Sequence, residues 1–517
     1  MPFITNIKCR AVLGILSLAL IVAVVGCDKP DTRGQGVPSV FVIVLDAANA
    51  EYFGCYGDPD NTSPNIDAFA AECVVFENAY SQTATTVSST ASLMTGTRAT
   101  THQMTDKTVL RSDLATMPEA LTNQGMTCYG VIGNPFAGAP ATGLNRGYAE
   151  CIEVYALEAL QKTRQSEESS KFKVTLPEDI NEQVEKLLPK IKSNGVFSYI
   201  HILQPHKPYT PPDKYLEKFG CRYTDWDHLH DKWMNSHRTG KVDSETIKDL
   251  EARYRANIAY VDEAVGELLK MLKKAGLYDD SLIILTSDHG EAFFKHRFFG
   301  HNATLYDDMT RVPLMIRFPR NQKVAPRRMM QLAETIDLMP TIFDYLGLDA
   351  PDVHEGDSLW RLIAGAKKNL PGPEVITCTI QRTRHAVRIE DYKYIYNQSS
   401  AEELYDLRHD PYEQHNLASE KPEALKRLRE FLSSRVNLLS GVAVAGNSKL
   451  RDDPAMDAIL DSLGYAGGAN EELIDHSRPE GATTQPTTRP ATTAPADLEP
   501  ATTQPAAAID QEGDSDC

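Results

Sequence analysis

The chain has 517 residues and a formal net charge of −18, from 53 Lys and Arg against 71 Asp and Glu. Its 42% hydrophobic residues suffice for a sizeable core, so wholesale disorder is excluded. The length fits one large α/β domain with additions or two to three domains of common size. The acidic balance argues against a nucleic-acid binder but not against an anionic small substrate, because a metal ion can invert the local field. No apolar run reaches the roughly 18 residues of a spanning helix, so we expect no polytopic membrane protein.

The first residues have the pattern of an export signal. Two basic residues precede a charge-free apolar stretch that ends in Val-Val-Gly, and the next residue is Cys27. This ending resembles the lipobox of bacterial lipoproteins, in which the Cys is acylated; the alternative is an ordinary signal peptide with an incidental Cys. We predict a lipoprotein signal peptide over residues 1–26, lipidation at Cys27 and a linker over residues 27–37. The protein is then exported and held to a membrane by lipid chains, in the periplasm or at the cell surface.

The middle of the chain alternates between strands and helices. Residues 39–45 (SVFVIVL) are typical of a strand buried on both faces, and Ser63 and Pro64 then start a helix that runs to about residue 72. Such alternation predicts a mostly parallel sheet sandwiched by helices. Further strands are expected at residues 126–132, 196–203, 281–287 and 312–318, and further helices at residues 114–123, 178–192 and 244–274.

Polar residues follow four of the predicted strands. Asp46 follows the first strand, Asn134 the second, His206 the third, and the pair Asp288-His289 the fourth. Each of these residues alone is more often part of a turn or loop. In open parallel sheets, however, sites lie at the carboxyl ends of the strands, and an acid with an imidazole suits a divalent metal ion. The convergence of all four groups therefore predicts a catalytic metal site.

A hydroxyl-rich stretch, residues 82–90 (QTATTVSST), leads into a short helix over residues 91–95 that ends at Gly96. One interpretation is a cluster of N-capping side chains. The other is a nucleophilic hydroxyl at a helix N-terminus, where the helix dipole favours an anion and a metal ion can ionise the hydroxyl. The physical pattern leaves five candidates open: Thr83, Thr85, Thr86, Ser88 and Ser89.

Several segments resemble a known family closely. They are Asp46 with residues 53–57 (FGCYG), 62–67 (TSPNID), 91–96 (ASLMTG), 205–209 (PHKPY), 286–291 (TSDHGE), 311–314 (RVPL), 337–341 (DLMPT) and 403–407 (ELYDL), followed by Asp410-Pro411 and Asn416-Leu417. In this order and spacing they resemble the sulfatases of the alkaline phosphatase superfamily, over residues 38–435. The resemblance implies an alkaline-phosphatase-like catalytic domain over residues 38–369. It also implies a small C-terminal α+β subdomain over residues 370–440, with a short antiparallel sheet and a helix.

The chain departs from the pattern of this family at its centre. Counting back from Gly96 places Thr86 at the position that sulfatases convert to formylglycine, and threonine is not a substrate for that conversion. Thr90 stands where the family has an activating Arg, and Ala47 where it has a second acidic ligand; the family's Gly-Lys element near residues 130–136 is absent. The remaining set resembles the single-metal site of threonine-using relatives, namely the phosphoethanolamine and phosphoglycerol transferases and some phosphodiesterases: Asp46, Thr86, Asp288 and His289.

These matches imply roles for individual residues. Thr86 is expected to be the metal-activated nucleophile, and His206 and His301 to bind the anion or protonate the leaving oxygen. Asn134 and His296 are further candidates for substrate binding, and the alternative for His296 is an exposed loop residue. The cofactor is expected to be one divalent metal ion, Mn, Zn or Ca. A single imidazole among oxygen ligands favours Mn or Zn over Ca.

The predicted function is a metal-dependent hydrolase of sulfate, phosphate or phosphonate esters, with a small molecule, a glycan or a lipid head group as substrate. One alternative is a transferase of the phosphoethanolamine or phosphoglycerol type. Another is a catalytically degenerate binder of anionic glycans. The loss of the family's residues at the positions of Ala47, Ser88 and Thr90 favours the degenerate binder, whereas the retained acids and imidazoles oppose it.

Three further segments lie outside these motifs. Residues 210–245 contain Trp226 and Trp233 and are expected either to shape substrate binding or to pack over the sheet. Residues 441–477 are predicted to form a helical extension. The Pro-, Thr- and Ala-rich residues 478–517 are predicted to be a disordered tail, because they cannot bury enough apolar surface to become ordered.

Overall fold

The computed structural model describes residues 37–156, 175–191, 194–222, 225–239, 243–302, 304–366, 372, 374–378, 383–398 and 400–435. The predicted signal peptide with Cys27, nearly all of the linker, the helical extension and the Pro-rich tail lie outside the described residues, so these expectations stay predictions. None of the helices in the described ranges combines the length and apolar composition that a membrane span requires.

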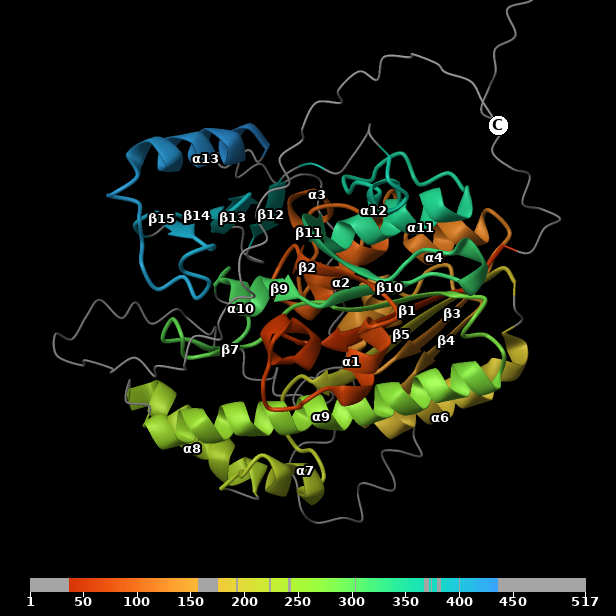
Figure 1. The fold of residues 1–517 in the computed structure, drawn as a ribbon, viewed down its shortest axis with the longest axis horizontal. Helices are drawn as coiled ribbons and strands as arrows, with labels where there is room; N and C mark the ends of the chain where they lie inside the picture. The colour runs from red at the N-terminus through yellow and green to blue at the C-terminus, as the bar shows by residue number, and fades with distance from the viewer. Residues whose placement is uncertain are drawn as a thin grey trace, which may run out of the picture. The chain divides into compact units, whose positions relative to one another are not determined.

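Nine strands form the central sheet (Figure 1). They are β1 (Val40–Asp46), β2 (Val74–Tyr80), β3 (Thr127–Ile132), β4 (Glu150–Glu153), β5 (Val196–Pro205), β6 (Leu282–Ser287), β9 (Arg311–Val312), β10 (Leu314–Arg317) and β11 (Arg327–Glu334). Their order is β11-β2-β10-β6-β1-β5-β3-β4, with β9 paired to β2. β6, β1, β5, β3 and β4 run parallel, whereas β10 is antiparallel to both of its neighbours. This mostly parallel sheet confirms the predicted fold class.

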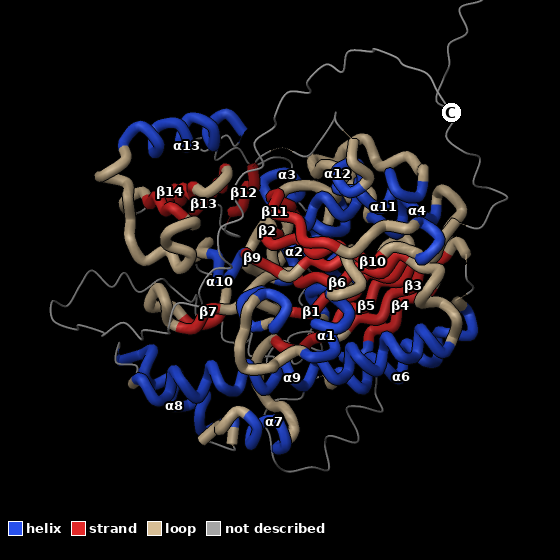
Figure 2. Tube along the Cα trace, viewed as in Figure 1, coloured by secondary structure: helices blue, strands red, loops and turns tan. Residues whose placement is uncertain are grey.

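Helices cover both faces of the sheet (Figure 2). One face packs against α1 (Pro64–Ala70), α6 (Pro177–Leu187) and α9 (Ser244–Lys274). The other packs against α2 (Thr86–Thr95), α4 (Met117–Thr122), α11 (Leu338–Leu346) and α12 (Leu359–Ile363). The central strand β1 serves both faces, because successive side chains of a strand point in opposite directions. Phe41, Ile43 and Leu45 belong to the first core, and Val40, Val42 and Val44 to the second.

Local sequence signals account for several helix boundaries. Thr116 caps α4 by accepting a hydrogen bond from the N–H of Glu119, and the Glu119 side chain accepts one from the N–H of Thr116. Ser63 stands at the N-cap of α1, but its hydroxyl instead bonds Gly54 and Asp67. α2 ends at Gly96, as predicted, but it begins at Thr86 rather than at residue 91, so the hydroxyl-rich stretch is itself the first turn of the helix.

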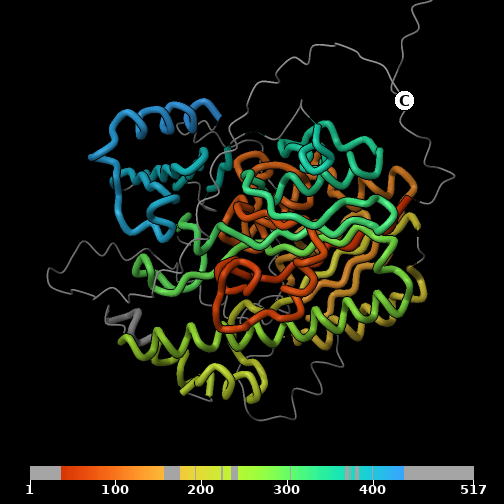
Figure 3. The backbone as a smooth tube through the Cα atoms, viewed as in Figure 1, coloured from red at the N-terminus to blue at the C-terminus, as the bar shows by residue number. Residues whose placement is uncertain are grey.

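In the central sheet, the predicted strands match within a few residues, with one break and three omissions. The predicted strand at residues 312–318 is divided by Pro313 into β9 and β10, because proline has no N–H to donate to a neighbouring strand. β2, β4 and β11 were not predicted, since they lack the uninterrupted apolar runs of the central strands. Figure 3 follows the chain order by colour, and this order differs from the spatial order of the strands: the pairing places the first strand, β1, between β5 and β6.

The C-terminal part contains a second sheet, as predicted. It is antiparallel, in the order β12 (Glu374–Cys378), β13 (Arg384–Ile389), β14 (Tyr392–Asn397) and β15 (Glu403–Asp406), and it packs against α13 (Pro422–Arg435). Tyr394 and Leu404 of this sheet share a core with Leu428 and Leu432 of the helix. Small elements complete the described fold: α3 (Ala99–His102), α7 (Asp213–Lys218), α8 (Trp226–Thr239), β7 (Ala292–Phe293), β8 (Phe299–Gly300) and α10 (Asp307–Thr310).

The segment over residues 210–245 packs onto the main core through its two tryptophans. Trp226 and Trp233 are buried. Trp226 meets Tyr209 at 5.2 Å between ring centroids, and Trp233 meets Phe299 at 4.9 Å. The two tryptophans of this segment therefore pack over the core, which is one of the two roles predicted for it.

Candidate active site

The polar residues that follow four parallel strands meet at one edge of the sheet. Asp46 is the last residue of β1, Asp288 follows β6, His206 follows β5, and Asn134 lies two residues beyond β3. β6, β1, β5 and β3 are consecutive neighbours in the sheet, so their carboxyl ends lie side by side. All four residues are almost completely buried. The predicted convergence is thus a feature of the structure.

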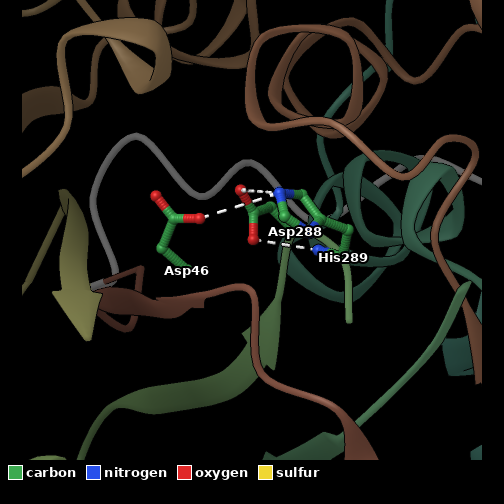
Figure 4. Close-up of side chains that lie close together, drawn as sticks. All are labelled: Asp46, Asp288 and His289. Carbon is green, nitrogen blue, oxygen red and sulfur yellow. Dashed lines mark hydrogen bonds and ion pairs between the residues drawn. The ribbon is translucent and has the colours of Figure 1, made fainter. Parts of the chain in front are cut away.

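Asp46, Asp288 and His289 form the centre of this group (Figure 4). One potential ligand atom from each of them lies within 4.8 Å of the other two. The Nε2 atom of His289 is 3.7 Å from Oδ1 of Asp46 and 3.7 Å from Oδ2 of Asp288. Carboxylate oxygens and an imidazole nitrogen at such spacing are a donor set that a divalent metal ion can share.

Hydrogen bonds orient these three donors. Oδ1 of Asp288 accepts from the backbone N–H of Ala47 at 3.0 Å and of His289 at 2.9 Å, whereas Oδ2 has no hydrogen-bond partner among the described residues. Oδ2 of Asp46 accepts from the amide of Asn134 at 2.6 Å. Nδ1 of His289 is 2.8 Å from the carbonyl of Gly290, and donation to that carbonyl leaves the Nε2 lone pair for a metal ion. The orphaned, buried Oδ2 of Asp288 indicates that the residues present fit a cation.

The electrostatics of the buried acids support this fit. Burial and the neighbouring charge of Asp288 raise the pKa of Asp46 well above its ordinary value. Burial alone would also raise the pKa of Asp288, but the imidazoles of His289 and His201 and the N–H of Ala47 hold it below its ordinary value. Two carboxylates this close destabilise each other when both are charged, and a divalent cation between them removes that cost.

Thr86 brings a hydroxyl to this centre. Its Oγ1 lies 3.3 Å from Oδ1 of Asp46 and 3.3 Å from Nε2 of His289. It is the first residue of α2, where backbone N–H groups lack partners within the helix and the dipole favours negative charge. The other hydroxyls differ: Thr83 and Ser89 bond each other at 2.8 Å, and Ser88 has no partner among the described residues. Of the five hydroxyls that the sequence left open, Thr86 is the one in contact with the acid and the imidazole.

Two further imidazoles adjoin His289. The ring centroid of His301 is 4.5 Å from that of His289 and 4.9 Å from that of His206. Nδ1 of His301 bonds Oε1 of Glu291 at 2.8 Å, and the other oxygen of Glu291 accepts from the hydroxyl of Tyr209 at 2.9 Å. Burial lowers the pKa of both His301 and His206 well below the ordinary value, and neighbouring imidazoles lower it further. Without a bound anion, both rings are therefore neutral near pH 7.

The two remaining candidates have other contacts. The amide of Asn134 is engaged on both sides, because it donates to Asp46 and accepts from the N–H of Phe136 at 3.0 Å. His296 is half-buried and stacks on Tyr306, with ring centroids 3.5 Å apart. Substrate binding by either residue stays a prediction.

Sequence reasoning missed three residues at this centre: His201, Glu291 and Tyr209. His201 lies within the buried strand β5, and the sequence pattern pointed only to residues that follow a strand. A polar residue within an otherwise apolar strand was the available signal, because an imidazole there needs a partner. Glu291 and Tyr209 belong to matched motifs, but the motifs do not state their contacts.

The fold and this site define the class of protein. It is an α/β enzyme in which acids, imidazoles and a hydroxyl meet at the carboxyl edge of a mostly parallel sheet, around a possible metal position. The chain belongs to the sulfatase family, whose model, described as Sulfatase, matches residues 38–348. A second model, described as N-sulphoglucosamine sulphohydrolase, C-terminal, matches residues 293–439. The predicted family and the predicted class of enzyme, a hydrolase that acts on ester bonds, are thereby confirmed.

Individual proteins resemble the chain over different lengths. It is 31% identical to arylsulfatase K of Bos taurus over 212 residues, which are 38% of this chain and 39% of that protein. It is 26% identical to the ulvan-active sulfatase of Formosa agariphila over 478 residues, which are 85% of this chain and 87% of that protein. The crystal structure of a phosphonate monoester hydrolase of Agrobacterium radiobacter superposes with a TM-score of 0.63, at 20% identity, over 80% of this chain and 100% of that one. This last likeness shows a shared fold.

Proposed function

We propose that the protein is a metal-dependent hydrolase of sulfate, phosphate or phosphonate esters, with Thr86 as the nucleophile. The observation that carries the proposal is the position of the Thr86 hydroxyl, 3.3 Å from both Asp46 and His289 at the N-terminus of α2. Asp46, Asp288, His289 and Thr86 would hold one divalent ion. When bound, such an ion lowers the pKa of a hydroxyl and offsets the negative charge of the transferred group.

The reaction that the residues of this chain support has two steps. In the first, Oγ1 of Thr86 loses its proton and forms a bond to sulfur or phosphorus, while the bond to the leaving oxygen breaks and that oxygen takes up a proton. In the second, water cleaves the threonyl ester and restores the hydroxyl. His301, oriented by Glu291, and His206 are placed to hold the anionic group. A bound anion favours the protonated form of a neighbouring imidazole, and that proton can then pass to the leaving oxygen.

Replacing Thr86 tests the nucleophile. We expect Thr86→Ala to lower turnover of aryl sulfate, phosphate monoester, phosphodiester and phosphonate probes by at least about 1,000-fold. The matched control is Ser88→Ala, which removes another buried hydroxyl of the same helix and should leave turnover within a few-fold of the parent. Stopped reactions of the parent should yield a Thr86 peptide heavier by one sulfuryl or phosphoryl group. Unchanged turnover in Thr86→Ala would remove the proposal.

The substrate is proposed from chemistry and from the named relatives. The similarity to an ulvan-active sulfatase supports a glycan as the carrier of the ester, and a small molecule or a lipid head group remains compatible with the same centre. Relative kcat/KM values on sulfate and phosphonate probes that share one leaving group separate the two kinds of ester. A preference of at least about tenfold would assign the class.

We also propose that the protein is exported and anchored through lipid chains at Cys27. The support is the residue pattern before this Cys, with its basic start, apolar stretch and small residues. Cells that express the chain with a labelled fatty acid should incorporate the label into the parent and not into Cys27→Ser. Equal labelling of both would rule out this anchor.

A further inference from the structure

His201 is a buried imidazole to which the proposed chemistry assigns no role. It lies within β5, is completely buried, and has no hydrogen-bond partner for either ring nitrogen among the described residues. An unpartnered polar group in the interior destabilises a fold, so a compensating interaction is expected. Nε2 of His201 faces two acids, at 3.8 Å from Oδ2 of Asp46 and 3.9 Å from Oδ2 of Asp288.

These separations are too long for hydrogen bonds but suit a shared ion. A nitrogen and an oxygen bound to the same transition-metal ion at about 2.0–2.2 Å are at most about 4.4 Å apart. Oδ2 of Asp288 is 3.7 Å from the imidazole of His289 and 3.9 Å from that of His201, and it has no hydrogen-bond partner among the described residues. One oxygen without a hydrogen-bond partner among the described residues therefore lies within 3.9 Å of two imidazole nitrogens, a pattern that a cation would satisfy.

The backbone pairing places His201 on the correct side of the sheet. His201 pairs with Val44 of β1, and paired residues of neighbouring strands point to the same face. Val44 belongs to the core beneath α2, the helix that carries Thr86. The residue next to Asp46, Ala47, has no side-chain donor, whereas the nitrogen of His201 reaches the same group from the adjoining strand.

We propose that His201 is a further protein ligand of the metal ion that Asp46, Asp288 and His289 hold. The inference rests on the proposed function, because it requires that ion. It also narrows the choice of ion: two imidazoles beside two carboxylates favour Zn²⁺ or Mn²⁺, whereas Ca²⁺ prefers oxygen ligands throughout. The competing arrangement is an uncoordinated His201 that interacts with the two carboxylates only through its charge when protonated.

The number of coordinated imidazoles distinguishes these arrangements without any substitution. The full chain is stripped of metal with a chelator and loaded with Co²⁺, and the hyperfine-shifted, exchangeable imidazole N–H signals are counted by proton NMR. Two such signals are expected, one from His289 and one from His201. A single signal in a chain that holds one Co²⁺ overturns the assignment of His201 and leaves the proposed function intact. A chain that takes up no Co²⁺, Zn²⁺ or Mn²⁺ overturns both.

Variants assign the second signal. His201→Gln should lose one of the two signals and bind Zn²⁺ at least about tenfold more weakly in competition with a chromophoric chelator. The matched control is His102→Gln, because His102 is also completely buried but bonds Ser92 and Met104 away from the site. His102→Gln should keep both signals and the parent affinity. If His201→Gln keeps both signals, His201 is not a ligand.

Discussion

Asp308 shows what an unpaired charge costs at the scale of a residue. It lies in α10, is almost fully buried, and neither of its carboxylate oxygens has a hydrogen-bond partner among the described residues. Burial raises its pKa to about 7; Lys295 and Lys393 lower it, and Glu51 and Asp307 raise it. Because the folded protein binds this proton more tightly than the unfolded chain does, the resulting stability is fully present below about pH 4. It is lost as the pH rises from there through the folded pKa of about 7, above which it no longer changes.

A neutral isostere should remove this pH dependence. Between pH 5 and pH 8 we expect the free energy of unfolding of the parent to fall by about 3 kcal/mol more than that of Asp308→Asn. About two pH units separate pH 5 from the folded pKa of about 7, and each unit corresponds to about 1.36 kcal/mol. Urea unfolding at both pH values measures the difference. Asp280→Asn, at an exposed position, should behave as the parent does. Parallel pH profiles for the parent and Asp308→Asn would contradict the argument.

At the scale of elements, a buried ammonium group joins the small sheet to the main fold. Lys393 of β14 lies 2.7 Å from Asp307 of α10 and 2.7 Å from Glu413, and all three side chains are largely buried. The charge of Lys393 also lowers the pKa of Asp307, against the effect of burial. Removing this cation leaves two acids close together in a medium of low polarity.

Lys393→Met should therefore destabilise the protein by about 3 kcal/mol or more, since it breaks a buried ion pair while keeping the aliphatic bulk. The loss is expected as a lower urea midpoint at pH 7. Lys421→Met is the control: the side chain of Lys421 is 41% exposed and lies 3.8 Å from Asp406, so the loss of this pair should cost less than about 1 kcal/mol. Equal losses in the two variants would show that burial of the pair does not matter.

At the scale of the whole molecule, the site depends on the complete sheet. Asp46, Thr86 and the Asp288-His289 pair come from three parts of the chain, and they meet only when β1, β6 and α2 are in place. An ion that binds this arrangement binds the folded protein and not the unfolded chain. Its binding must then raise global stability by mass action.

Adding Zn²⁺ or Mn²⁺ to the metal-free protein should raise Tm. A free ion concentration of 100 times Kd corresponds to about 2.7 kcal/mol. Asp288→Asn should lose this increment together with activity. Asp262→Asn, which alters a buried acid that binds the start of α1, should lower Tm but keep the increment. A rise of the same size in Asp288→Asn would place the ion elsewhere.

Much of this fold could be read from short stretches of sequence. The runs at β1, β5 and β6 are mostly apolar, so their burial on both faces was predictable from residue type. β2 and β11 mix polar and apolar residues, and their place in the sheet depends on partners far away in the chain. The first turn of α2 was missed for a related reason: Ser and Thr are weak helix formers, and the packing of α2 against the sheet outweighs that preference.

The sequence by itself determined the alternation of strands and helices, the family, and the two acids and the imidazole that lie together at the centre, Asp46, Asp288 and His289. These follow from local periodicity and from motif spacing. The tertiary structure alone decided that the hydroxyl of Thr86, and not that of Ser88, contacts Asp46. It also decided that Asn134 donates a hydrogen bond to this acid and that His201 faces it from β5. Such contacts join residues 40 to 155 positions apart. They depend on strand register and helix placement, which arise from the packing of the whole chain and leave no local pattern.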